Sequence, residues 1–162
     1  MFRLFTLALV FAFGSGVVQF ANQTAALRAK FMKEADPVRK ARVLGPLADA
    51  EFHDMQQQLA ADNSAEAGVV ARQLSEEAQD CRKALDAKVK DPEKHPSGYK
   101  ELQISVRQSL RRIDNIVIGL PGDEQKPFLD VRKDLDQMDR ELIHELFPLR
   151  PADPTAPGAP KT

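Results

Sequence analysis

Residues 128–146 read FLDVRKDLDQMDRELIHEL and carry the most regular apolar pattern in the chain. Apolar residues recur there every three or four positions, which places them on one face of an α-helix. The spacing resembles a heptad repeat, the pattern of helices that pack lengthwise against one another. The stretch therefore predicts a long amphipathic helix whose buried stripe is Phe128, Val131, Leu135, Met138, Leu142 and Leu146.

Three stretches before it repeat this pattern, at about residues 37–61, 64–89 and 99–120. Asp36-Pro37 is typical of a helix start, and Gly45-Pro46 is expected to interrupt and bend the first of these helices. The predicted stripes are Ala41, Leu44, Ala48, Phe52, Met55 and Leu59; then Ala67, Val70, Leu74, Ala78, Cys81, Leu85 and Val89; then Leu102, Val106, Leu110, Ile113, Val117 and Leu120.

Turn signals separate the predicted helices. They are Asp62-Asn63-Ser64, the stretch 90–98 with two prolines and a glycine, and Pro121-Gly122-Asp123. A short helix is expected ahead of them, at about residues 24–35. Long helices of matched length joined by short connections favour an antiparallel arrangement. The predicted fold is all-α, an antiparallel helical bundle of about four long helices with a short N-terminal helix, in a domain spanning 22–147.

The N-terminal segment has the layout of a secretory signal peptide. Arg3 precedes an apolar run at 4–13, and the small residues Gly14, Ser15 and Gly16 follow it. We expect residues 1–21 to direct export to the periplasm or the extracellular space. Since no charge occurs from residue 4 to residue 27, an uncleaved membrane anchor at 4–21 is a second interpretation, and a buried core helix is a third.

The C-terminal segment 148–162 has proline at every third position, at 148, 151, 154, 157 and 160. A period of three matches the polyproline II helix, which has no internal hydrogen bonds. We expect this segment to be a disordered tail outside the core.

Composition excludes several classes of function. With 162 residues the chain has room for one domain, and 23 Lys and Arg against 24 Asp and Glu give no net charge to attract nucleic acid. A single cysteine rules out a disulfide framework within the chain and a cysteine-based zinc site. Cys81 falls on a predicted apolar stripe, so we expect it to be buried.

Charge is divided unevenly between the last two long helices. Residues 82–112 contain nine basic and four acidic residues, whereas residues 121–147 contain four basic and eight acidic ones. Two neighbouring helices of opposite charge would form flanking ion pairs, an explanation we prefer to an anion or lipid-headgroup patch.

Candidate chemical groups are few. Glu141 and His144 have the i, i+3 spacing by which a helix contributes to a di-metal site, but no second Glu-x-x-His occurs. We expect both to flank the core as solvated residues, so they are only weak candidates for a metal site. No serine or cysteine lies in the context of a nucleophile, and no phosphate-binding glycine loop follows the N-terminal segment. We predict no enzymatic activity, no cofactor and no metal.

These features favour an exported, non-catalytic protein-interaction module, an adaptor or a holdase-like protein that binds another envelope or secreted protein. It would carry an exposed apolar stripe. The alternative is a bundle that binds a small ligand or metal between its helices, in a polar-lined cavity near His53 or His144. A signal-anchored membrane protein is the third possibility.

Overall fold

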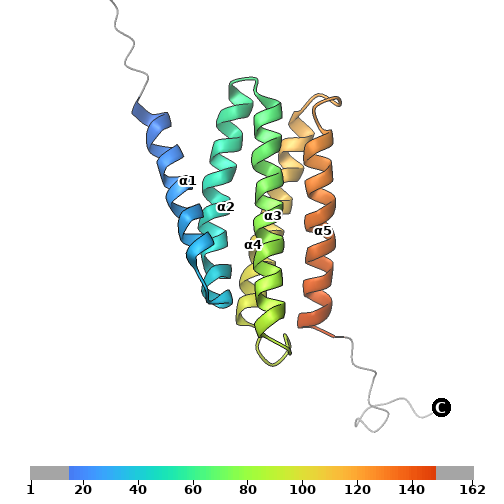
Figure 1. Cartoon of the computed structure of the whole chain (residues 1–162). Helices are drawn as coiled ribbons and strands as arrows, with labels where there is room; N and C mark the ends of the chain where they lie inside the picture. Colours follow the sequence, from blue (N-terminus) through green and yellow to red (C-terminus); the bar gives the residue numbers. More distant parts are fainter. Residues whose placement is uncertain (1–14, 149–162) are drawn as a thin grey trace, which may run out of the picture.

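The computed structural model describes residues 15–148, and their side chains from Gln23 onward. The helices are α1 (Ser15–Lys33), α2 (Pro37–Ala60), α3 (Ser64–Lys88), α4 (Ser97–Gly119) and α5 (Lys126–Leu146). No strand occurs between residues 15 and 148, so the predicted all-α bundle is confirmed (Figure 1). The predicted signal peptide at 1–21 and the tail at 148–162 lie outside the described residues, apart from 15–21 and Pro148.

The N-terminal helix differs from its prediction. It has 19 residues and begins at Ser15, so the described part of the chain forms five helices of 19 to 25 residues rather than four long helices and a short one. The start expected near residue 24 was set by the boundary of the predicted signal peptide. No proline or charged residue between 15 and 24 stops a helix there.

The start of α2 is confirmed, but its predicted interruption is wrong. The Asp36 carboxylate caps the helix by accepting a hydrogen bond from the Arg39 backbone N–H at 2.8 Å, and Pro37 follows as the first helical residue. Helix α2 then continues through Pro46 to Ala60. Proline removes only one donor from the hydrogen-bond ladder, and the buried neighbours on both sides of it, such as Leu47, hold the helix in place.

Four of the helices form a closed bundle. Helix α2 packs on α3, α3 on α5, α5 on α4, and α4 on α2, and successive helices run in opposite directions (Figure 1). Helix α1 lies outside this group, against α2, and diverges from α2 toward its own N-terminal end (Figure 1). The main core therefore closes without α1.

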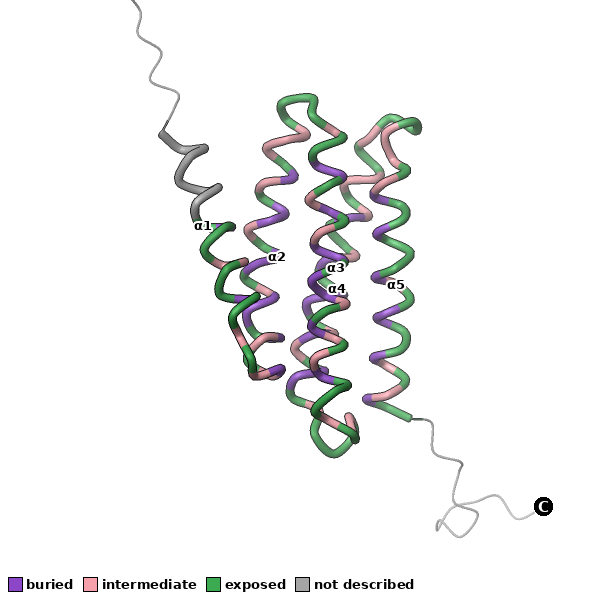
Figure 2. Tube along the Cα trace, viewed as in Figure 1, coloured by how far each residue is buried: buried purple, intermediate pink, exposed green. Residues whose placement is uncertain are grey.

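The core lies along the bundle axis, where buried positions of the four helices face one another (Figure 2). Every predicted stripe residue of α5 is buried, whereas stripe residues near helix ends, such as Leu59 and Leu120, are only partly covered. Cys81 is fully buried as predicted, and burial raises the pKa of its thiol to about 12.

The expected ion pairs between α4 and α5 are present. The Asp139 carboxylate accepts a hydrogen bond from Gln103 at 2.8 Å and lies 3.8 Å from Arg107, and Arg132 contacts Asp114 at 2.5 Å. Of these two ion pairs, Arg107–Asp139 places the cation on α4 as the uneven charge predicts, whereas Arg132–Asp114 places it on α5.

The first turn of α4 is tightly packed at Gly98. A Cβ built on Gly98 would lie 2.4 Å from Leu85 Cδ2 and 3.3 Å from Val38 Cγ2. Leu85 is itself fully buried, so it has little room to move. Only glycine fits at this point of contact between α2, α3 and α4.

We therefore expect Gly98→Ala to lower the free energy of unfolding by about 1 to 3 kcal/mol, the usual cost of overpacking. Gly119→Ala is the control, because a Cβ there meets nothing within 4 Å. It should change stability by less than about 0.5 kcal/mol in the same urea titration. Equal effects of the two substitutions would contradict the packing at Gly98.

Candidate functional site

From Gln23 onward, where its side chains are described, helix α1 contacts the bundle through a narrow strip of four residues. Thr24, Leu27, Arg28 and Phe31 follow one another at helical spacing, and Thr24 and Phe31 are buried while the other two are partly covered. The Lys40 ammonium of α2 lies 4.5 Å from the centre of the Phe31 ring. Most of the other described α1 residues are exposed, so few apolar side chains hold this helix in place.

A cluster of three charged residues joins α1 to both α2 and α3. Arg28 of α1 donates from Nη2 to Oε1 of Glu51 on α2 at 2.5 Å, and from Nε to Oε1 of Glu77 on α3 at 3.0 Å. The Glu51 side chain is 0% exposed and that of Glu77 is 7% exposed. We call these three residues the α1 clamp. One guanidinium therefore faces two buried carboxyl groups.

The environment of the α1 clamp favours the protonated form of its carboxyl groups. Among the described residues no group donates a hydrogen bond to the buried Oε2 of Glu51 or of Glu77, and the two carboxyl groups repel each other when both are ionised. Burial, followed by repulsion from Glu77, raises the pKa of Glu51 to about 8, although Arg28 opposes the shift. Burial also raises the pKa of Glu77. Burial and mutual repulsion therefore favour retention of a proton by the pair near neutral pH.

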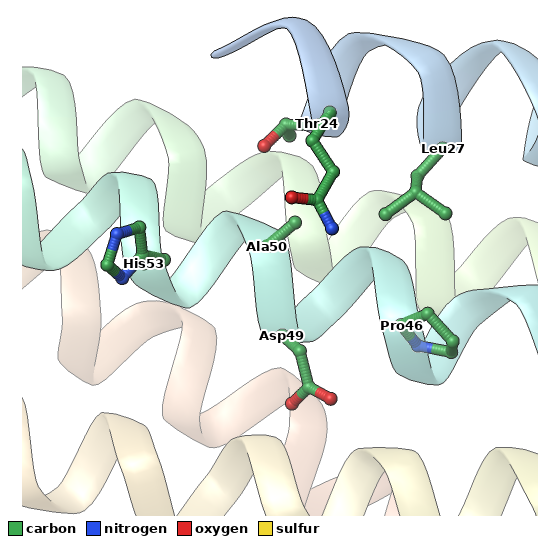
Figure 3. Close-up of a pocket in the computed structure, with 7 residues that line it drawn as sticks. Thr24, Leu27, Pro46, Asp49, Ala50 and His53 are labelled. Carbon is green, nitrogen blue, oxygen red and sulfur yellow. The ribbon is translucent and has the colours of Figure 1, made fainter. Parts of the chain in front are cut away.

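A cleft of about 430 Å³ opens next to the α1 clamp, between α1 and α2 (Figure 3). Leu27 of α1 points toward α2, and Pro46 and Ala50 supply the facing apolar surface (Figure 3). Asp49 points away from α1 and pairs with Arg112 of α4 at 2.6 Å. The full lining is Gln23, Thr24, Leu27, Pro46, Asp49, Ala50 and His53.

The sequence-predicted candidates lie elsewhere. Glu141 and His144 are both exposed on α5, and Glu141 accepts a hydrogen bond from Gln137 at 3.0 Å. Among the described residues, no group of three or more His, Cys, Asp or Glu side chains is placed to hold a metal ion. The absence of a metal and of a cofactor stays a prediction. His53, in contrast, lines the α1–α2 cleft, as the ligand-binding alternative requires.

The residues of the α1 clamp were not singled out from the sequence. Glu51 follows Leu47 by four positions and precedes Met55 by four, which places a carboxylate within an apolar stripe. Glu77 likewise falls between Leu74 and Cys81. An acidic residue in register with buried neighbours is the signal that points to such a site, because a carboxylate is rarely buried without a partner.

Comparison with known proteins finds no matching family model, no matching curated protein and no matching solved structure. In the part of the chain that the structure describes, no helix combines the length and apolarity needed to cross a membrane.

Arg28→Met tests the α1 clamp. Among the described residues Arg28 is the one cation paired with the two buried carboxyl groups. Its removal should lower the free energy of unfolding by about 3 kcal/mol at pH 7, since a buried ion pair is costly to break from one side. Arg132→Met breaks a pair with Asp114 in which both side chains are more than 40% exposed, and should cost no more than about 1 kcal/mol. Similar losses for the two variants, measured by urea unfolding, would contradict a special role for Arg28.

The raised pKa of Glu51 determines whether the free energy of unfolding rises or falls with pH. Between pH 4.5 and about 8 the unfolded chain releases the Glu51 proton while the folded chain keeps it, so stability should fall by about 2 to 4 kcal/mol across this range. Above about pH 8 the curve should level. Glu51→Gln should flatten the curve, whereas Glu101→Gln, which alters an exposed carboxylate near Arg42, should leave the slope unchanged. Chemical unfolding at a series of pH values gives the free energy of unfolding of all three proteins. A wild-type free energy of unfolding that rises from pH 5 to pH 8 would contradict the raised pKa of Glu51.

Proposed function

We propose that this chain is an exported, non-catalytic protein-interaction module, an adaptor that binds another envelope or secreted protein at the α1–α2 cleft. The observation that carries the proposal is the position of α1, which lies outside a four-helix bundle that closes without it and leaves an open cleft against α2. Because α1 packs on one side of this bundle, the cleft beside it is accessible to a partner.

The cleft suits one apolar side chain of a partner. Leu27, Pro46 and Ala50 form an apolar floor, while Gln23 and His53 give the cleft a polar rim. Binding energy at protein interfaces is concentrated where a buried anchor enters such a pocket surrounded by polar groups. A partner segment lying along α1 and α2 could place its anchor there.

The exposed apolar side chains favour an adaptor over a holdase. A holdase would need a continuous apolar surface to cover unfolded clients. The exposed apolar stripe predicted for an adaptor or a holdase is not present among the described residues. Their large exposed apolar side chains are instead spread over four helices and the end of the bundle. They are Met32, Val69, Ile104, Ile118, Leu129 and Phe147.

A second candidate function is the binding of a small ligand in the same cleft. Its volume of about 430 Å³ falls within the range of natural ligand sites, and His53 lines it.

The proposal of export rests on the composition of residues 1–21, with a membrane anchor at 4–21 as the alternative.

Site-specific photo-crosslinking in the cells that make the protein tests the adaptor. A photoreactive residue in place of Gln23, at the cleft rim, should capture one dominant protein, while the same group in place of Ile104 on α4 should not. Ala50→Leu, which fills the cleft, should abolish the product from position 23. Ala25→Leu makes the same change at an exposed α1 position outside the cleft and should leave that product intact.

The outcomes separate the candidates. Equal capture at positions 23 and 104 would overturn the adaptor proposal, and so would a product that persists in Ala50→Leu. A small bound mass in native mass spectrometry that Ala50→Leu removes, with no protein captured at position 23, would establish the ligand-binding alternative instead.

A further inference from the structure

We propose that the proton shared by Glu51 and Glu77 is a latch: while it is bound, α1 stays docked on the bundle, and when it is lost, α1 is released while α2 to α5 remain folded. This inference concerns the α1 clamp alone and does not depend on the identity of a partner.

The charge balance of the α1 clamp determines whether gain or loss of the proton releases α1. With the proton bound, one carboxylate balances Arg28 and the other carboxyl group is neutral. Without the proton, two carboxylates face one guanidinium, and Oε2 of Glu51 and Oε2 of Glu77 carry charge in a buried place with no donor. Arg28 contacts both groups from α1, so undocking opens their α1-facing side to water. Release follows when the hydration of two charges outweighs the loss of the two Arg28 contacts.

Other charged groups around the clamp leave this balance in place. Asp80 of α3 acts on Glu77 and raises its affinity for a proton further. On the neighbouring α4, Arg112 is already bound to Asp49. Lys40 of α2 lies 4.5 Å from the centre of the Phe31 ring and acts on the Cys81 thiol, but no ion pair joins it to either carboxyl group. The two carboxyl groups therefore have Arg28 as their one close cation among the described residues.

Release can be confined to α1 because of how the helices pack. Within the described residues, α1 packs along α2, and its contact with α3 is made by the Arg28 side chain. The four remaining helices close on one another. Local opening requires the loss of few buried apolar groups, here chiefly Phe31 and Leu27.

Hydrogen exchange measured by mass spectrometry on the whole protein tests the latch. Protection factors, corrected for the intrinsic effect of pH on exchange, would be compared between pH 6 and pH 9 for peptides of α1 and of α4. We expect the protection factors of α1 to fall at least tenfold from pH 6 to pH 9, while those of α4 change by less than threefold. The fall in α1 should be about tenfold for each pKa unit by which undocking lowers the pKa of the pair.

Two variants and a control sharpen the test. Glu51→Gln and Glu77→Gln each replace one carboxyl group by a neutral amide of the same shape, and each should keep α1 protected at pH 9. Glu101→Gln, at an exposed ion pair between α2 and α4, should behave as the wild type does. Wild-type α1 protection that is constant or rises with pH would overturn the proposal, as would equal loss in α1 and α4.

Discussion

One guanidinium shared by two buried carboxyl groups determines how α1 relates to the rest of this protein. Ionised groups are costly to bury, and Arg28 is the one cation that pairs with Glu51 and Glu77 among the described residues. The apolar core of α2 to α5 carries no comparable conflict. Hydrophobic burial holds the α2 to α5 bundle, whereas the attachment of α1 combines the burial of Phe31 with the electrostatics of the α1 clamp.

The bundle could be predicted from the sequence because its determinants are local. The apolar spacing from Phe128 to Leu146 is regular and lies within one helix, and the turns between helices contain turn-forming residues. The length of α1 was misjudged for a physical reason: the composition that suggests an export signal also permits a helix, and the pattern alone does not say where one ends and the other begins.

The candidate site could not be predicted in the same way because it is assembled from three helices. Arg28 is 23 positions from Glu51 and 49 positions from Glu77 in the sequence. Periodicity shows that Glu51 shares a face with Leu47 and Met55, but it does not show which cation covers it. Glu141 and His144 illustrate the opposite error, since a suggestive local spacing lies on a solvent-exposed face.

The short connection between α1 and α2 keeps a released α1 close to the bundle. Only residues 34–36 separate the two helices, and Lys88 donates a hydrogen bond to the Ala35 carbonyl at 2.8 Å, which ties this segment to the end of α3. A released α1 would thus remain at an effective concentration on the order of millimolar or more beside the surface of α2 and α3 that it had left. Any molecule that binds this surface must displace the tethered α1. Its apparent affinity would therefore depend on pH as well as on its own contacts.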